Sequence, residues 1–269
     1  MGDIARQSVR DESVLYNALG INAELLIDHA WGWEPTEIKH IKAYKPQSNS
    51  ISSGQVLMEP YTAENARLIV REMTELLVLD LVKKGLVTKK VELTIGYDRT
   101  SIEYEYRGPS IKDSTFKNTT TGERYMGRVT TDPYGRPLPY HAHGTGNIDR
   151  WTSSTKRIVE TMIELYDKII DLDLLIRRVT VVACNIIGEK EIPVEEPYQM
   201  DLFTDYTALA EQRAEEDAAD AREKKLQRAT LVLQEKFGKN AVLKGMNLQK
   251  GAMTIKRNKQ IGGHSSGED

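Results

Sequence analysis

The stretch TAENARLIVREMTELLVLDLVKKGLVTKKVELTIGY, residues 62–97, predicts a long helix followed directly by a strand. Thr62 is a suitable N-cap, and apolar residues recur at helical spacing as far as Leu81. Two lysines and Gly85 then end the helix with positive charge and a glycine C-cap. Beyond the glycine, apolar and polar residues alternate, which predicts a strand with one buried face. Its apolar positions are Val91, Leu93, Ile95 and Tyr97.

Similar patterns on either side complete a mixed fold. A polar, serine-rich segment from residue 46 turns apolar at residues 55–57 and precedes the helix. A strand is expected at residues 139–147, a helix at 152–170 capped by Ser153 or Ser154, and a fourth strand at 177–187. Residues 98–140 are rich in Gly, Thr, Pro and Tyr and predict a hairpin-like insertion. The order predicts an α+β fold: a four-stranded βαββαβ sheet with two helices on one face.

Residues 1–33 predict short helices around a tight corner, and residues 34–45 predict a linker. A glycine and free backbone N–H groups at a helix start form a ready phosphate site of the helix-hairpin-helix kind. The alternative is an ordinary helix-turn-helix corner, which these residues taken alone favour. The candidate phosphate-binding residues are Gly20, Asn22 and Ala23.

The open face of the sheet is expected to carry basic and hydroxylic side chains. Such side chains contact the sugar-phosphate backbone of a nucleic acid rather than its bases. A plain serine-rich loop is the alternative for the serines. The candidate DNA-binding residues here are Lys45, Ser50, Ser52, Ser53, Lys90, Thr94, Arg178 and Thr180.

A proline-framed connector spans residues 192–204. Pro193 and Pro197 exclude a helix and a central strand there. Exposed connectors of this kind hold short docking peptides, although an apolar pair can equally staple a connector onto its domain. The candidate docking peptide consists of Gln199, Met200, Asp201, Leu202 and Phe203.

A helix is expected at residues 205–238, and residues 239–269 are expected to form a basic, flexible tail. The first half of the helix is mostly charged and is expected to be solvated. The second half carries an apolar stripe that predicts packing against the domain. The stripe consists of Leu226, Ala229, Leu233 and Phe237.

Composition excludes several classes of protein. The longest apolar run is far too short to span a bilayer, so no membrane partner is expected. A single cysteine, Cys184, excludes an internal disulfide framework and suits a reducing cytoplasm. The net charge of -3 argues against a uniformly basic surface, although residues 236–259 hold seven basic residues and no acid. His141 and His143 share a strand face, but no acidic or cysteine ligand lies at zinc spacing, so a metal-dependent hydrolase is a minor alternative.

In this order, the segments resemble the C-terminal half of Y-family translesion DNA polymerases of the DinB/UmuC type. The chain is most similar to the UV-damage-repair branch of Gram-positive bacteria and their mobile elements. The resemblance covers nearly the whole chain. It rests on residues 1–5 and 19–26 for the end of the thumb, 50–54 and 85–91 for strands of the little finger, and 237–241 for a C-terminal motif.

The resemblance implies a role in DNA repair and translesion synthesis within the SOS response. Residues 1–33 would be a partial thumb, residues 46–191 a little finger that holds duplex primer-template DNA, and residues 192–204 a connector that docks on the DNA polymerase sliding clamp. In that family Gln199, Leu202 and Phe203 would enter pockets of the clamp. Such a protein works in the cytoplasm at the nucleoid.

One departure from the family concerns catalysis. The palm and fingers lie upstream of the thumb, and this chain begins within the thumb-like segment. Phosphoryl transfer needs carboxylates around two metal ions, whereas Asp171 and Asp173 lack a third partner. We therefore expect no catalytic residue and no cofactor on this chain, Mg²⁺ belonging to the palm. The chain would be a truncated gene product, a split subunit or an expressed domain. A standalone regulatory or RNA-binding α+β module is the alternative function.

Overall fold

The computed structural model describes residues 1–44, 49–105, 114–193, 206–261 and 264–265. The chain divides into two compact units, Met1–Gln47 and Ser48–Asp269. No helix within the described ranges is long and apolar enough to cross a bilayer.

The first unit consists of α1 (Gly2–Arg10), α2 (Ser13–Leu19), α3 (Asn22–Ala30) and α4 (Ile38–Ala43). The carboxylate of Asp11 accepts hydrogen bonds from the backbone N–H and the hydroxyl of Ser13, at 2.9 and 2.6 Å, and so starts α2. Residues 34–45 were predicted to be a linker, but helix α4 lies within them, so part of this segment is helical. Among residues 1–44 only Ala23 is buried, so this unit has almost no core of its own.

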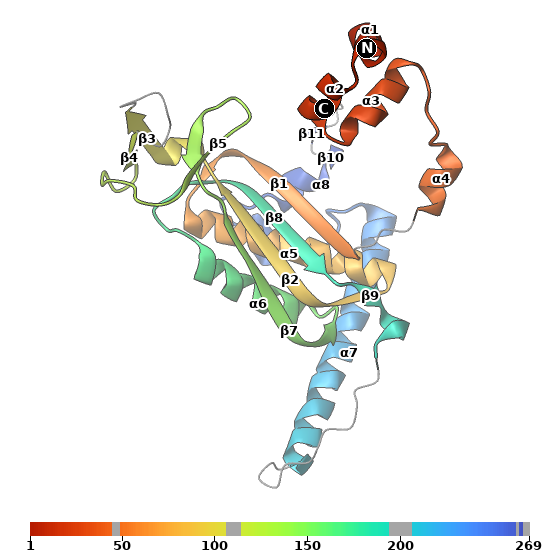
Figure 1. The fold of residues 1–269 in the computed structure, drawn as a ribbon. Coiled ribbons are helices and arrows are strands. Elements are labelled where there is room, and N and C mark those ends of the chain that lie inside the picture. Colours follow the sequence, from red (N-terminus) through yellow and green to blue (C-terminus); the bar gives the residue numbers. More distant parts are fainter. Residues whose placement is uncertain (45–48, 106–113, 194–205, 262–263, 266–269) are drawn as a thin grey trace. The chain divides into compact units, whose positions relative to one another are not determined.

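The second unit is built on an antiparallel sheet in the order β1-β8-β2-β7 (Figure 1). These strands are β1 (Ser50–Tyr61), β2 (Leu86–Tyr97), β7 (Ala142–Thr152) and β8 (Ile176–Cys184). A short fifth strand, β9 (Ile187–Gly188), pairs with the start of β2. Helices α5 (Ala63–Lys84) and α6 (Thr155–Ile169) cover one face. The α+β prediction and its βαββαβ order are confirmed, although the third strand runs from residue 142 to 152 instead of 139 to 147.

Local chemistry sets the ends of the two helices as the sequence predicts. The Thr62 hydroxyl accepts from the backbone N–H of Asn65 at 3.4 Å. The Ser154 hydroxyl accepts from the N–H of Arg157, also at 3.4 Å. Gly85 ends α5 at φ 66°, a left-handed conformation that favours glycine.

The core lies between the sheet and these helices. From residue 90 to the end of β2 the buried side chains are Val91, Leu93, Ile95 and Tyr97, as the alternation predicts. The buried Tyr166 side chain lies in the core, and its hydroxyl donates a hydrogen bond to the carbonyl of Ala63 at 2.6 Å. Helix α6 approaches β7 so closely that a Cβ on Gly146 would lie 2.7 Å from the Thr161 Cγ2. The glycine is therefore required by this close packing.

The insertion after β2 forms two small hairpins. It begins with η1 (Arg99–Ser101) and contains β3 (Ile102–Glu105) paired with β4 (Thr115–Asn118), and β5 (Val129–Thr131) paired with β6 (Pro137–Pro139). The Ser101 hydroxyl accepts from the N–H of Leu175 at 2.9 Å, and the Asn118 amide donates to the carbonyl of Asp173 at 3.2 Å. These bonds fix the β3–β4 pair to the turn before β8.

Helix α7 (Tyr206–Phe237) binds the domain through polar residues. Glu223 accepts from the Ser154 hydroxyl at 2.6 Å and from the N–H of Thr155 at 2.7 Å, and so caps the start of α6. The buried Gln227 donates to the carbonyl of Ser153 at 3.0 Å. The predicted apolar stripe faces solvent instead: its member Leu226 is 68% exposed. The prediction that the stripe packs is wrong because bonded glutamine and glutamate side chains occupy the contact face.

The segment after α7 is folded in its described residues, 239–261 and 264–265, and so differs from the predicted flexible tail. It contains η4 (Gly245–Leu248), α8 (Thr254–Asn258), β10 (Gln260–Ile261) and β11 (His264–Ser265). The buried carboxylate of Glu72 on α5 accepts from the Asn247 amide at 2.8 Å and from the N–H of Met253 at 2.7 Å. Met253 itself joins the core cluster, so the segment is part of the helix layer.

Candidate nucleic-acid interface

The face of the sheet opposite α5 and α6 forms a regular array of cross-strand rows. In each row the paired residues of neighbouring strands point to the same side, with Cβ atoms about 4.5–5.5 Å apart. We call this surface the open face. Its four rows are Ser50-Cys184-Lys90-Asn147, Ser52-Val182-Glu92-Thr145, Gly54-Thr180-Thr94-His143 and Val56-Arg178-Gly96.

Hydroxyl groups and cations dominate the open face. Each strand contributes a polar donor, and the two cations, Lys90 and Arg178, lie at opposite ends of the array. Donors of this kind, spread over a flat surface, suit the phosphates of a backbone. Among these rows Glu92 is the only carboxylate.

Glu92 lies within a small polar network. Its carboxylate is 4.0 Å from the His143 Nδ1, and that nitrogen is 3.0 Å from the Thr94 hydroxyl. On the other side, the Cys184 thiol lies 4.0 Å from Glu92. Burial and the Glu92 charge raise the pKa of the Cys184 thiol. The thiol therefore stays protonated at neutral pH and is no nucleophile.

Six of the predicted DNA-binding residues lie together on the open face, because each occupies an alternate position of its strand. They are Ser50, Ser52, Lys90, Thr94, Arg178 and Thr180. Ser53 does not join them. It pairs with the buried Val181 and therefore points to the helix side, where its hydroxyl accepts a hydrogen bond from Arg257.

The predicted phosphate site at the corner between α2 and α3 belongs to the first unit. Gly20 adopts φ 59°, which favours glycine. However, its N–H donates to the carbonyl of Tyr16 at 2.8 Å, and the N–H of Ala23 donates to the Gly20 carbonyl at 3.0 Å. Two of the N–H groups expected for a phosphate are therefore already used, and the N–H groups of Ile21 and Asn22 are the remaining candidates at this corner.

Two further predictions fall outside the described residues. Lys45 is one. The docking peptide, Gln199 to Phe203, is the other. The structure describes the elements on both sides of that peptide: η3 (Glu189–Glu191) and α7, which are joined by an ion pair between Glu189 and Lys224.

The open face offers no platform for stacking bases. None of the residues in its four rows is Phe, Tyr or Trp. Tyr97, which follows Gly96 directly, is buried in the core. Tyr140, which precedes β7, is covered by the guanidinium of Arg128 at 3.9 Å and stacked on His141 at 4.2 Å. In the described part of the chain, no three His, Cys, Asp or Glu side chains form a cluster that would hold a metal ion.

Sequence reasoning missed two members of the open face. Thr145 and Asn147 on β7 have no motif that marks them. Their alternation with less exposed neighbours was the available signal, but only the strand register shows which residues lie beside them.

One comparison with known proteins gives a match. A family model described as "impB/mucB/samB family C-terminal domain" matches residues 48–202, which is more than half of the chain. A search of curated proteins finds no match. The matched range begins just before β1, contains all four long strands with α5 and α6, and ends before α7.

Proposed function

Because the chain belongs to the impB/mucB/samB family, and so represents the C-terminal part of a Y-family translesion DNA polymerase, we propose that its open face holds duplex primer-template DNA during synthesis past damage. The observation that carries this proposal is the register of the sheet. It aligns hydroxyl and cationic side chains from all four long strands on the side away from the helices.

The contacts would be made to phosphates and would not depend on sequence. Lys90 and Arg178 supply charge, while Ser50, Ser52 and Thr180 supply short hydroxyl donors that fix the position of the backbone. A damaged template needs this kind of grip, since contacts to base edges would discriminate against altered bases. The catalytic metal ions would belong to a palm and not to this domain.

A salt titration tests the proposal. We expect the double variant Lys90→Gln with Arg178→Gln to lower the slope of log K against log salt by about 1.8, and the affinity at 0.1 M salt by about 60-fold, if each cation neutralises one phosphate. The measurement is fluorescence anisotropy with a labelled duplex and the full chain. The matched control is Lys156→Gln with Lys168→Gln, because both lysines are exposed on α6 on the helix side and the change in net charge is the same. An affinity that does not vary with salt, or equal losses in both variants, would refute the proposal.

We also propose that residues 199–203 dock on the DNA polymerase sliding clamp. The support is the sequence of the peptide, with Leu202 and Phe203 as apolar anchors and Gln199 as the polar one. The double change Leu202→Ala with Phe203→Ala should abolish clamp binding in a pull-down and leave duplex binding intact. Loss of both activities would mean that the pair packs in the domain.

The alternative, an RNA-binding module, predicts aromatic residues on the open face, because single-stranded RNA is bound by stacking. The rows of the open face contain none. The same titration with single-stranded RNA decides the point: a higher affinity for RNA than for duplex DNA would favour that function. We further propose that the chain belongs to the Gram-positive UV-damage-repair branch and acts in the SOS response, on the resemblance of residues 1–5, 19–26, 50–54, 85–91 and 237–241 in their order and spacing.

A further inference from the structure

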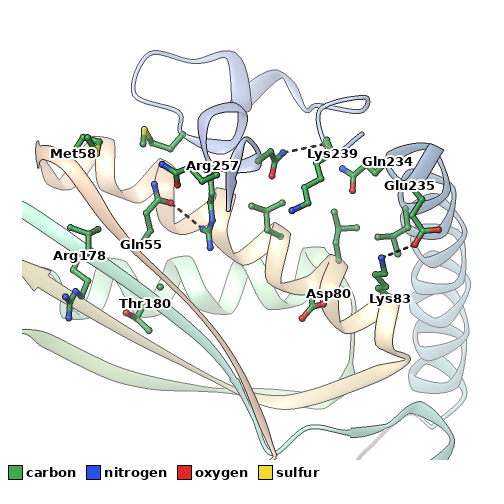
Figure 2. Close-up of a pocket in the computed structure, with 18 residues that line it drawn as sticks. Gln55, Met58, Asp80, Lys83, Arg178, Thr180, Gln234, Glu235, Lys239 and Arg257 are labelled. Carbon is green, nitrogen blue, oxygen red and sulfur yellow. Dashed lines mark hydrogen bonds and ion pairs between the residues drawn. The ribbon is translucent and has the colours of Figure 1, made fainter. Parts of the chain in front are cut away.

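A groove runs along the outer edge of β1 (Figure 2). Within the described residues β1 pairs only with β8, so its other edge is unpaired. The groove has a volume of about 1090 Å³ and is lined by β1, α5, α7 and the segment around α8. We call it the β1 groove. Both α7 and α8 lie outside the range that the family model matches, so the matched domain supplies only one wall of the groove, formed by β1, β8 and α5.

The guanidinium of Arg257 projects from α8 into the β1 groove (Figure 2). It donates to the Gln55 Oε1 at 3.3 Å and to the Ser53 hydroxyl, which are both neutral acceptors. Among the described residues, no carboxylate lies within 4.0 Å of it. Burial lowers the pKa of Arg257, and the charge of Glu72 offsets part of that effect. Since a guanidinium has five N–H donors, three remain for a ligand.

The other charges of the β1 groove leave an excess of cations. Its two carboxylates already have lysine partners: Glu235 pairs with Lys83 at 2.9 Å, and Asp80 pairs with Lys84 at 2.7 Å. Lys239 extends its amine into the groove (Figure 2). In the described part of the chain, it has no acidic partner within 4.0 Å. An anionic ligand would therefore meet Arg257 and Lys239 without competing carboxylates.

The β1 groove is continuous with the open face. Arg178 and Thr180 of the open face also line the groove, and Gly54 and Val56 form its rim on β1. Gly54 has no side chain, and a Cβ there would only touch the Thr180 hydroxyl at 3.5 Å. A bound polymer can therefore pass over the edge of the sheet at this position.

We propose that the β1 groove binds the phosphodiester backbone of a single DNA strand where it leaves the duplex held on the open face. This inference rests on the proposed function. The recess has the volume of a site for a ligand of drug-like size, which fits a short stretch of one strand and not a duplex. No aromatic side chain lines it, so the contacts are to phosphates and not to stacked bases.

The test compares two labelled DNAs by fluorescence anisotropy with the full chain: a blunt duplex, and the same duplex with a single-stranded extension. Wild-type protein should bind the extended DNA more tightly. The double variant Arg257→Gln with Lys239→Gln should lose about 25-fold in affinity for the extended DNA at 0.1 M salt, or about fivefold per lost single-strand contact. Its affinity for the blunt duplex should not change. The matched control is Lys250→Gln with Lys256→Gln, because both lysines are exposed and lie outside the groove and the change in net charge is the same.

A second variant tests the groove at a position outside the open face. Gln234→Glu adds a carboxylate to the groove from α7, so it should repel a phosphate and also reduce the preference for extended DNA. Unchanged preference in both variants would overturn the inference while blunt-duplex binding still supports the proposed function. If the wild-type protein does not bind the blunt duplex, the proposed function is overturned. Binding of a single-stranded oligonucleotide would then test the groove alone. Equal competition by a polyglutamate peptide of the same charge would assign the groove to acidic proteins instead.

Discussion

Glu72 holds the C-terminal segment on α5, and we predict that Glu72→Gln destabilises the protein by about 3 kcal/mol. The carboxylate is only 2% exposed, and it accepts from the Asn247 amide at 2.8 Å and from the N–H of Met253 at 2.7 Å. Glutamine keeps the shape but replaces one oxygen by an NH₂ group, which would face a donor. One charge-assisted bond is lost, worth about 1.5–3 kcal/mol, and a buried N–H loses its partner at a cost of about 1–3 kcal/mol.

The measurement is urea unfolding of the full chain, followed by circular dichroism, together with hydrogen exchange at residues 245–258. Exchange there should accelerate in Glu72→Gln even under native conditions, since the segment is released before the sheet unfolds. Glu160→Gln is the control, because Glu160 is exposed on α6 and should change stability by less than about 0.5 kcal/mol. If Glu72→Gln unfolds at the same urea concentration as the wild type and its amides exchange at the same rate, apolar contacts of Met253, and not this carboxylate, hold the segment.

Three further outcomes follow from the packing and charges. Burial raises the pKa of Tyr97 to about 12, whereas the phenol of an unfolded chain titrates near 10. The stability that the protonated phenol contributes is therefore complete below about pH 10 and is lost as the pH rises to 12. In urea unfolding at a series of pH values, Tyr97→Phe should make the fall in the free energy of unfolding between pH 10 and 12 less steep. Gly146→Val should cost about 1–3 kcal/mol in urea unfolding, because a Cβ there meets Thr161 at 2.7 Å. Glu223→Ala should cost about 1–2 kcal/mol, by the same assay, because α6 loses the cap at Ser154.

The sequence predicted the sheet because both of its signals are local. Alternation along residues 90–97 places Val91, Leu93 and Ile95 in the core whatever the register, and Thr62 and Gly85 mark the ends of α5 through their own backbone chemistry. Ser53 shows where local reasoning failed. It was grouped with Ser50 and Ser52 by composition, but the period of two places it on the helix side.

The C-terminal third was predicted less well, because its contacts are polar and distant in sequence. On α7 the apolar residues mark the solvent side, where Phe237 is 64% exposed, while the buried face is formed by Glu223 and Gln227. Their partners on α6 are more than 65 residues away. In the same way, a single carboxylate, Glu72, orders a segment whose composition is typical of a tail. Hydrophobic periodicity carries no information about such bonds.

The distribution of charge, and not its sum, should decide how the open face binds DNA. Three acidic residues of α7, Glu216, Asp217 and Asp220, bind Arg150 and Arg157 on the helix side of the sheet. A layer of about 10 Å separates that side from the open face, which is close to one Debye length at 0.1 M salt. Their repulsion of a phosphate is therefore largely screened. Glu92 has no such separation, because it lies within the rows themselves.

Two variants with the same change in net charge test this argument. Glu92→Gln should raise duplex affinity about fivefold to tenfold at 0.1 M salt, because one like charge is removed from the contact surface. Glu215→Gln, at an exposed position on α7, should leave duplex affinity unchanged. Both affinities come from the same anisotropy titration, repeated at low salt, where the longer screening distance should let Glu215→Gln gain slightly. Equal gains at 0.1 M salt would mean that net charge governs binding and that the open face is not the contact surface.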